Sequence, residues 1–397
     1  MSGHFTKTNM KIGLVQGFYF MALCVLFSFL VRLLKSYGYN DYECGIALSC
    51  GAFATLTVQP LAGLLADRVK SVGRLIVLLL LASCMAIAAL LLVHQNRVLT
   101  YIFIFILFGT MRPLTYIIDV WSIRTGTSDP SFSYGFTRSF GSLAYAVASL
   151  LYGLAIDAFG TGFIIPCFLV LCVVTMYVVV LASSTPKDFA IEKPRNKIGI
   201  LRSLYVLFSN KYYVLLVVCF TLMEISRMPG QNYLTRKFEV MGAKEIFTGL
   251  AFFVTAIIQL PALNKMDSLK KRHRATSLMW VSLTGVSLRI TLLGITRTTL
   301  GTLCSLLIDL VGLGLYVGSL IYYMLYFLPP EVHFLGMTVY AAFTGGLGGM
   351  IGNYIAGILA NEYGVLAMYK LTAIPAAVGL LIYSICMFAW RKGNPES

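Results

Sequence analysis

Three carboxylates lie well inside long apolar runs of this chain: Asp119, Glu224 and Asp309. A charged side chain at the centre of a bilayer costs roughly 2.5–3.5 kcal/mol even on lenient insertion scales, so such residues are rare without a partner or a water-filled path. They could bind a polar solute or carry a proton across an apolar barrier. Their position makes them the first candidates for function.

Arginines stand at helical spacing from two of these carboxylates. Arg112 precedes Asp119 by seven residues, so in a helix both would lie on nearly the same face, about 10 Å apart along the axis. Glu224, Arg227 and Gln231 follow one another at intervals of one turn. A planar guanidinium makes bidentate hydrogen bonds to a carboxylate or to adjacent hydroxyls. Such pairs can bind a solute, or they can simply neutralise each other between helices, and the spacing fits both roles.

A third helical face combines a cation with an aromatic ring. Arg138, Gly141 and Tyr145 occur at i, i+3 and i+7, which places them on one side of a helix. An aromatic face can cover the apolar side of a sugar ring while the guanidinium bonds its hydroxyls.

Membrane-spanning helices must hold these residues. Of the 397 residues, 58% are hydrophobic and only 12% are charged, whereas soluble domains have about 25% charged residues. The mean hydropathy is +0.82. Apolar runs of about 20 residues, long enough to cross a bilayer core of about 30 Å as helices, recur along the chain. We expect an all-α membrane protein with twelve spans, at 12–35, 45–66, 73–94, 98–121, 134–158, 162–182, 212–235, 246–264, 275–295, 299–327, 333–360 and 365–390.

Lys and Arg residues gather between alternate spans. The basic clusters lie at 7–11, 68–74, 187–202, 265–274 and 391–392. Because cytoplasmic loops carry the excess of Lys and Arg, both termini and the central loop are predicted to be cytoplasmic. We expect no signal peptide in the polar N-terminal residues, and an integral protein of the plasma (inner) membrane.

The longest polar stretch divides the predicted spans six and six. Residues 183–210 contain SSTPKDFAIEKPRNK, which is too rich in Pro and Lys to enter the membrane. The predicted organisation is an N-terminal six-helix bundle at 1–185, a cytoplasmic loop at 186–210 and a C-terminal six-helix bundle at 211–397.

The composition argues against several classes of function. The net charge of +15 is distributed as membrane topology requires, so we predict no nucleic-acid partner. The nine cysteines are scattered singly, without a CxxC motif or a histidine at ligand spacing, which indicates packing residues. The sequence shows no nucleophile–base pair either. We therefore expect no enzyme, no cofactor and no metal.

The segment 45–74 resembles the second span and following loop of the major facilitator superfamily. That family's loop signature is Gly-x-Leu-x-Asp-Arg followed by basic residues. The positions that match it are Gly63, Leu65, Asp67, Arg68 and Arg74. The preceding Gln-Pro-Leu is similar to the lactose-permease branch of the oligosaccharide:proton symporters. The resemblance implies two pseudo-symmetric six-helix bundles and makes Gly63, Asp67, Arg68 and Arg74 a gating loop, in which Asp67 latches one state.

A second match, YGFTRSFGSLAYA at 134–146, resembles the fifth span of the same branch. There a Gly-x-x-Arg-x-x-Gly segment presents an arginine to the substrate, and an aromatic residue four positions after the second glycine stacks on the sugar ring. By this resemblance Arg138 is the arginine and Tyr145 is the aromatic residue. Asp119 falls near the acidic residue that partners this arginine in sugar symporters. To this predicted substrate site the helical spacing adds Arg112 and Gln231.

The second half of the chain resembles the same branch in topology and less in its residues. SLRITLLG is similar to the ninth-span segment whose arginine belongs to the proton-coupling network, which implies that role for Arg289. Related sequences place a histidine where this chain has Asp309. The carboxylate that handles the proton in the lactose permease corresponds to Gly312. We therefore predict that Asp309 with Arg289 couples the proton, and that Glu224 with Arg227 is the second candidate.

The predicted function is transport of a small polar solute, a sugar or a nucleoside, by a proton-coupled symporter with alternating access. Five arginines inside spans face three carboxylates, which also allows an organic anion such as an aromatic acid. Arg32, one of the five, can instead reach the outer surface. Weaker alternatives are a drug exporter, whose site would need net negative charge for organic cations, and a non-transporting sensor on the same fold. The expected partners are the solute, protons and the lipid bilayer, and the protein is expected to be a monomer.

The glycine-rich segment 345–357 has small residues spaced by four inside a predicted span. This spacing favours close helix packing over a phosphate-binding loop, with a flexing gate as the alternative.

Overall fold

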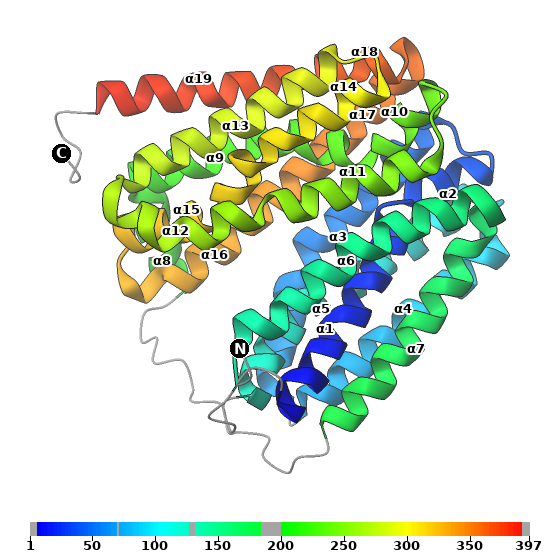
Figure 1. Ribbon diagram of the computed structural model, residues 1–397. Coiled ribbons are helices and arrows are strands. Elements are labelled where there is room, and N and C mark those ends of the chain that lie inside the picture. The colour runs from blue at the N-terminus through cyan, green and yellow to red at the C-terminus, as the bar shows by residue number, and fades with distance from the viewer. Residues whose placement is uncertain (1–5, 70, 127–131, 184–199, 391–397) are drawn as a thin grey trace. The chain divides into compact units, whose positions relative to one another are not determined.

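A computed structural model describes residues 6–69, 71–126, 132–183 and 200–390 (Figure 1). The side chains of some helical residues, among them Gly63, Asp67 and Arg68, lie outside this description. All regular structure within the described ranges is helical, and eleven helical stretches, some of them made of consecutive helices, are long and apolar enough to cross a membrane. The predicted all-α membrane fold is confirmed.

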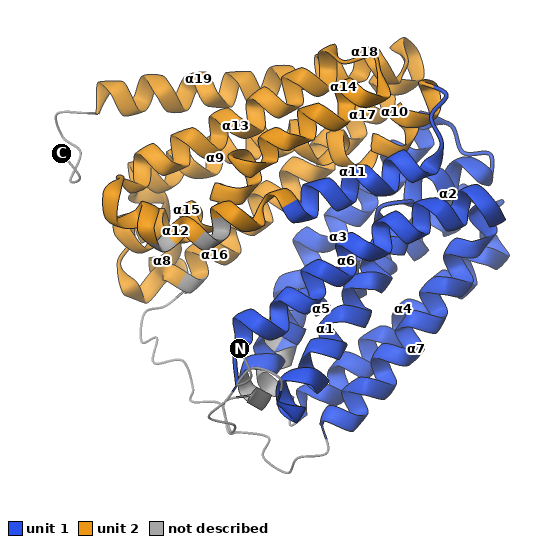
Figure 2. Cartoon of the chain, in the orientation of Figure 1, with its two compact units in different colours: residues 1–192, 242–257 blue, residues 193–241, 258–397 orange. Residues whose placement is uncertain are grey.

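Contacts between helices divide the chain into two compact units (Figure 2). Unit 1 comprises residues 1–192 and 242–257, and unit 2 comprises residues 193–241 and 258–397. The predicted bundles at 1–185 and 211–397 differ from these units mainly at 242–257, which groups with unit 1. Within the predicted loop at 186–210, residues 200–209 form a short helix.

Unit 1 packs its helices around α1. The helices are α1 (Lys7–Phe27), α2 (Leu30–Ser36), α3 (Asp41–Arg68), α4 (Val72–Val93), α5 (Arg97–Gly126), α6 (Tyr134–Phe159), α7 (Ile164–Ala182) and α11 (Glu245–Ile258). α1 packs against α6 and α7, and both α3 and α4 pack against α5. Local sequence fixes the start of α3, where Asn40 and Glu43 exchange side-chain and backbone hydrogen bonds of 2.8 Å.

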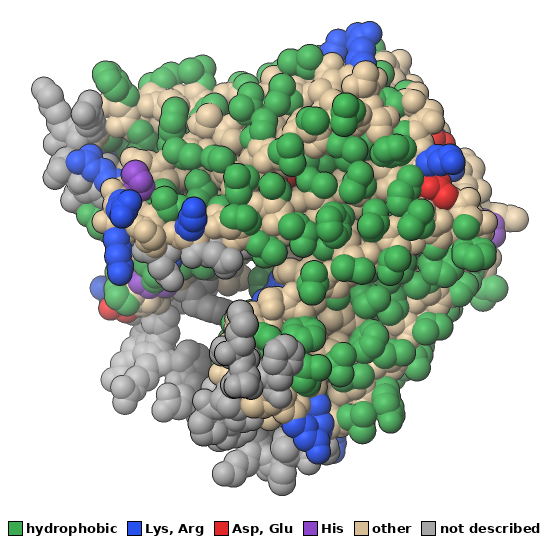
Figure 3. All heavy atoms as spheres, in the orientation of Figure 1, with side chains coloured by type: hydrophobic (Ala, Val, Ile, Leu, Met, Phe, Trp, Pro, Cys, Tyr) green, Lys and Arg blue, Asp and Glu red, His purple; other side chains and the backbone are tan. Residues whose placement is uncertain are grey.

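Unit 2 is built around α9, which packs against α17 and α19. Its helices are α8 (Ile200–Ser209), α9 (Lys211–Asn232), α10 (Leu234–Val240), α12 (Leu260–Arg272), α13 (Ala275–Ile295), α14 (Thr299–Leu306), α15 (Gly312–Phe327), α16 (His333–Ala341), α17 (Gly349–Tyr363), α18 (Val365–Leu371) and α19 (Ala373–Ala389). The core combines aliphatic residues with wholly buried tyrosines such as Tyr323 and Tyr383. Hydrophobic side chains also cover much of the visible surface of the molecule (Figure 3), as lipid contact requires.

The predicted span 246–264 consists of two helices that belong to different units. α11 ends at Ile258 and α12 begins at Leu260, directly before Pro261. In unit 1, the Asp157 carboxylate of α6 accepts hydrogen bonds from the backbone amides of Glu245 (2.8 Å) and Ile246 (2.9 Å). These amides start α11 and have no partner inside their own helix. A side chain from α6 therefore caps the first half of this span.

The predicted span 333–360 is helical throughout but changes helix type. Between α16 and α17, residues Ala342–Gly348 form a π-helical segment. A Cβ atom added to Gly348 would lie 3.0 Å from the backbone oxygen of Thr221 on α9, and one added to Gly352 would collide with the backbone oxygen of Ile225. The glycines thus let two backbones approach closely, which confirms the packing interpretation at these two positions.

A buried lysine caps the C-terminal end of α13. Lys237 of α10 is wholly buried, and its ammonium group donates hydrogen bonds to the backbone oxygen of Leu293 and, at 3.0 Å, to Thr296 Oγ1. The Tyr369 ring lies 4.9 Å from Lys237 Nζ. The last carbonyls of a helix have no partner within it, and a cation is favourable there. Lys237 therefore joins α10 to α13 and α18.

The glycine contacts predict opposite effects for two neighbouring substitutions. Gly352→Ala would force α17 away from α9, and overpacking of this kind costs about 1–3 kcal/mol. Gly345→Ala meets nothing within 4 Å, and alanine gains helix propensity of up to about 1 kcal/mol. Thermal unfolding of the purified protein in detergent should show a lower midpoint for the first variant and an unchanged or higher one for the second. Equal midpoints would contradict the packing role of Gly352.

Burial lowers the pKa of Lys237 to about 8 from its ordinary value of 10.5. Between these values the unfolded chain retains a proton that the folded chain has lost, so the free energy of unfolding should rise with pH by up to about 1.4 kcal/mol per pH unit. Lys237→Met should lack this rise between pH 8 and pH 10, whereas Lys244→Met, an exposed lysine four residues beyond α10, should keep it. The measurement is chemical unfolding of the three proteins across that range. Identical pH profiles would show that Lys237 is not the group responsible.

Candidate functional site

The first candidate site lies in unit 1 and joins α5 to α6. Arg138 Nε lies 3.4 Å from Asp119 Oδ1, and the two side chains are 31% and 21% exposed. Both residues belong to helices long and apolar enough to span a membrane. The predicted partnership of these two residues is therefore present as a salt bridge, and its partial exposure leaves polar atoms within reach of a solute.

Two residues of α1 complete this arrangement. Gln16 Nε2 donates hydrogen bonds to Asp119 Oδ1 (2.9 Å) and to Ser122 Oγ (3.2 Å), and Gln16 is wholly buried. The ring centroid of Phe20 lies 4.3 Å from Arg138 Cζ, which is a cation–π distance. Sequence reasoning missed both residues. The only signal for Gln16 was a neutral amide inside an apolar run, and nothing distinguished Phe20 from the many other aromatic residues.

Gly141 makes room for the ring beneath the arginine. A Cβ atom at this position would lie 2.7 Å from a ring carbon of Phe20 and 3.3 Å from Arg138 Nη1. The absence of a side chain therefore allows Phe20 to contact Arg138, which gives a local physical reason for the second glycine of the Gly-x-x-Arg-x-x-Gly pattern.

Tyr145 and Arg112 lie on the expected helices and contact other residues of unit 1, and their substrate-binding role stays a prediction. The hydroxyl of Tyr145 lies 2.8 Å from Oγ of Ser28, the residue that follows α1, so its polar end bonds within unit 1. Arg112 Cζ lies 4.5 Å from the Phe27 ring and 5.6 Å from the Phe108 ring. The shared helical face with Asp119 does not produce a salt bridge, because Asp119 pairs with Arg138 on the neighbouring helix.

The second candidate site lies in unit 2, where α9 carries one ion pair. Glu224 is 2% exposed and takes two contacts from Arg227, Nε to Oε1 at 2.9 Å and Nη2 to Oε2 at 2.8 Å. Arg227 Nη1 also donates to Gln231 Oε1 at 3.1 Å. The three residues therefore contact one another, as their helical spacing predicted.

A deeper ion pair joins α13 to the tenth span. Arg289 Nε lies 3.1 Å from Asp309 Oδ2, and the two side chains are 2% and 0% exposed. Asp309 lies in a 3-10 turn, Leu307–Leu310, that interrupts the span between α14 and α15. Arg227 is close enough to Asp309 to interact with its charge. The two ion pairs of unit 2 thus lie in the same region of that unit.

Gly312 stands at the position where the lactose permease has its proton-handling carboxylate, and its backbone lies close to that of α13. A Cβ atom on Gly312 would lie 3.0 Å from the Val286 backbone nitrogen, and one on Gly285 would lie 2.7 Å from the Gly312 nitrogen. The Ser282 hydroxyl donates to the Gly312 carbonyl at 2.8 Å. A carboxylate could not occupy this position without moving α13, so any carboxylate chemistry in this region falls to Asp309 or Glu224.

Paired tyrosines lie beside the same ion pairs. The hydroxyls of Tyr316 and Tyr340 are 2.7 Å apart, and the Tyr316 ring stacks on Phe220 with centroids 5.4 Å apart. Tyr340 also interacts electrostatically with Glu224 and Arg227. These tyrosines add hydroxyl groups next to the charged side chains, and sequence reasoning did not single them out because tyrosines are frequent along the whole chain.

The remaining predicted residues fall outside these two sites. Arg74 is exposed on α4, and the side chains of the other gating residues, Gly63, Asp67 and Arg68, lie outside the described part, so the gating role stays a prediction. Arg32 Nε lies 3.0 Å from Glu245 Oε1 within unit 1. It therefore has a carboxylate partner beyond the three that were counted inside spans.

The arrangement defines the class of protein: an all-α membrane protein whose helical spans carry carboxylate–arginine pairs. Residues 9–371 match the MFS_1 like family, and the chain belongs to that family. The resemblance to the major facilitator superfamily predicted from 45–74 and 134–146 is thereby confirmed.

Two curated relatives are similar over almost their whole length. The chain is 24% identical over 392 residues to the uncharacterized transporter YwbF of Bacillus subtilis, covering 96% of this chain and 95% of the relative. It is 24% identical over 386 residues to the maltose permease of Geobacillus stearothermophilus, covering 95% and 94%.

Solved structures show the same fold at low identity. The nucleoside transporter NupG aligns with a TM-score of 0.78 at 14% identity, over 96% of this chain and 99% of that one. A D-xylose-proton symporter aligns with a TM-score of 0.69 at 13% identity, over 95% of each chain.

Proposed function

We propose that this protein is a secondary active transporter that moves a small polar solute, a sugar or a nucleoside-like molecule, by alternating access and proton symport. The observation that carries the proposal is the partly exposed Asp119–Arg138 salt bridge with Phe20 beneath the arginine. The names of three similar proteins, which refer to maltose, nucleosides and D-xylose with a proton, support the choice of a hydroxyl-rich solute.

The unit 1 site offers complementary groups for such a solute. Asp119 accepts from a substrate hydroxyl, and Arg138 donates to a second one, as a fixed carboxylate and a planar guanidinium do for neighbouring hydroxyls. Gln16 holds Asp119 Oδ1 in place. An aromatic ring can cover the apolar face of the solute, and Tyr145, Arg112 and, in unit 2, Gln231 remain predicted contributors.

Proton coupling is assigned to Asp309 with Arg289, and Glu224 with Arg227 is the second candidate. Burial favours the neutral acid whereas a neighbouring arginine favours the carboxylate. A carboxylate that gains and loses its arginine between states therefore loads and releases a proton. Asp309 and Arg289 are the more deeply buried pair, so separation would change the proton affinity of Asp309 most strongly.

An organic anion such as an aromatic acid is the second candidate substrate. The sequence places five arginines inside spans, and the structure places one of them, Arg112, over two aromatic rings, those of Phe27 and Phe108. A cation beside aromatic rings would suit a ligand that combines a carboxylate with an aromatic ring, and this observation supports the second candidate.

The cellular arrangement completes the proposal. Because the basic clusters alternate along the chain, we place both termini and the central loop in the cytoplasm. We further propose that the protein lies in the plasma membrane and acts as a monomer. The loop at 63–74 is proposed to latch one transport state.

Transport should be visible as a solute-dependent pH change. Proteoliposomes that contain the full chain are exposed to sugars, nucleosides and aromatic acids, and the external pH is recorded. A transported solute should make the medium more alkaline, and Arg138→Ala should reduce its rate about tenfold or more, since a hydrogen bond to a charged group contributes about 1.5–3 kcal/mol.

Arg236→Ala is the matched control, because Arg236 pairs with Glu239 on α10, outside both sites. A response to aromatic acids alone would favour the second candidate. No response to any solute, from protein that unfolds cooperatively, would favour the non-transporting sensor.

The coupling assignment predicts that Asp309→Asn separates two activities. The side-chain amide of asparagine neither takes up nor releases a proton near neutral pH. Uphill accumulation driven by a pH gradient should therefore disappear, while exchange of labelled for unlabelled solute continues. Continued exchange also shows that the variant is folded. Uphill accumulation that survives in Asp309→Asn but is lost in Glu224→Gln would transfer the coupling role to Glu224.

A further inference from the structure

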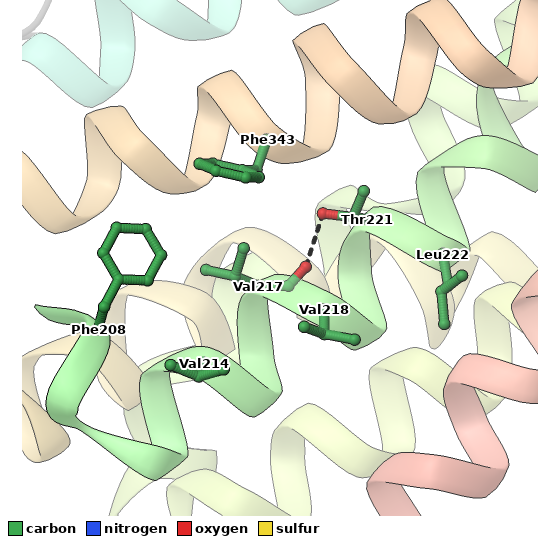
Figure 4. A pocket seen from close by; sticks show the side chains of 7 residues that line it. All are labelled: Phe208, Val214, Val217, Val218, Thr221, Leu222 and Phe343. Carbon is green, nitrogen blue, oxygen red and sulfur yellow. Dashed lines mark hydrogen bonds between the residues drawn. The ribbon is translucent and has the colours of Figure 1, made fainter.

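An apolar groove runs beside the first turns of α9 in unit 2, apart from the ion pairs. Two adjoining cavities, of about 260 and about 400 Å³, share the residues Phe208, Val214 and Val218. The smaller cavity is lined in addition by Val217, Thr221, Leu222 and Phe343 (Figure 4). The groove therefore lies between α8, α9 and the π-helical segment at Ala342–Gly348.

The side chains that line the smaller cavity offer no free hydrogen-bond donor to a ligand. Its single polar side chain, Thr221, donates its hydroxyl to the Val217 backbone oxygen at 2.7 Å, which is the dashed line in Figure 4. Every other lining side chain is a hydrocarbon. A polar solute would lose its hydration there without compensation, whereas a hydrocarbon chain would not.

The larger cavity has a positive end. Its lining adds Ser209, Lys211, Leu215 and Trp390 to the shared residues. Lys211 Nζ lies 4.8 Å from the Trp390 ring and 5.3 Å from the Tyr212 ring. No carboxylate pairs with this exposed lysine among the described residues. Lysine and tryptophan are enriched where a span meets the lipid headgroups.

The length of the groove fits one leaflet. Lys211 and Leu222 are eleven residues apart on α9, which corresponds to roughly 16 Å along the axis and to about half of a hydrocarbon core of about 30 Å. On α8, Leu201 and Tyr205 are 84% and 74% exposed, as expected of a helix that lies in the membrane interface. A cation at one end of the groove and an apolar path extending from it therefore match the headgroup and the acyl chain of a lipid in one leaflet.

We propose that this groove binds an anionic phospholipid, with the phosphate beside Lys211 and one acyl chain along Val214, Val218 and Leu222. The charge of Lys211 selects the anionic headgroup, and the lining of the smaller cavity accepts the chain. The site is independent of the transported solute.

Trp390 provides a probe within the site. The chain has three tryptophans, so Trp121→Phe with Trp280→Phe leaves Trp390 as the only one. This protein is reconstituted in phosphatidylcholine vesicles that contain a minor fraction of lipid with brominated acyl chains, either phosphatidylglycerol or phosphatidylcholine. Bromine quenches tryptophan fluorescence on contact. Phosphatidylglycerol should bind about fivefold more strongly, the preference that one lysine confers at about 1 kcal/mol.

Three variants distinguish the outcomes. Lys211→Gln should abolish the preference, Val218→Phe should weaken quenching by filling the groove, and Lys265→Gln, an exposed lysine of α12, should change nothing. Equal quenching by both lipids in the parent protein, or a preference unchanged by Lys211→Gln, overturns the proposal. Preferential quenching by brominated oleic acid alone would identify a fatty acid and also reject the phospholipid. If the double tryptophan variant unfolds, native mass spectrometry of the wild type with the same lipids and lysine variants gives the same comparison.

Discussion

The cost of placing a charge in hydrocarbon governs the organisation of this protein. Each carboxylate singled out inside the spans lies beside an arginine: Asp119 with Arg138, Glu224 with Arg227, and Asp309 with Arg289. An unpaired carboxylate at these depths would be expelled or protonated. The pairs therefore determine which helices must be neighbours, since two of the three join different spans. For the deepest pair, the close contact between Gly285 and Gly312 and the 3-10 turn at Leu307–Leu310 allow the two spans to approach each other.

The pairs differ in access to solvent, and this difference divides their proposed roles. Asp119 and Arg138 are partly exposed, with an aromatic ring and a buried amide holding them in position. Such a site can exchange hydration for contact with a solute. Asp309 and Arg289 are sealed from solvent, so each charge is balanced by the other and not by water. Recognition suits the first pair, and storage of a proton suits the second.

Sequence reasoning succeeded where local geometry decides the outcome. Hydropathy identified the spans because their length is set by the bilayer, and helical spacing identified Glu224, Arg227 and Gln231 because one helix carries all three. The Asp119–Arg138 pair required the family resemblance, since the two residues lie on different helices.

Gln16, Phe20 and the burial of Lys237 could not be anticipated, because they depend on which side chains neighbouring helices bring together. Periodicity contains no information of that kind. The same holds for Gly312, whose lack of a side chain becomes meaningful only beside Gly285.

The division of the eighth span has a mechanical consequence. α11 is fixed to α6 through Asp157 and belongs to unit 1, whereas α12 belongs to unit 2, and only Gln259 separates them. A continuous helix is stiff, but a proline removes a backbone hydrogen bond and lowers that stiffness locally. The chain passes between the two units at three points, and this span holds one of them. A change in the torsion angles near Gln259 and Pro261 would let the two halves of the span turn without unwinding either helix.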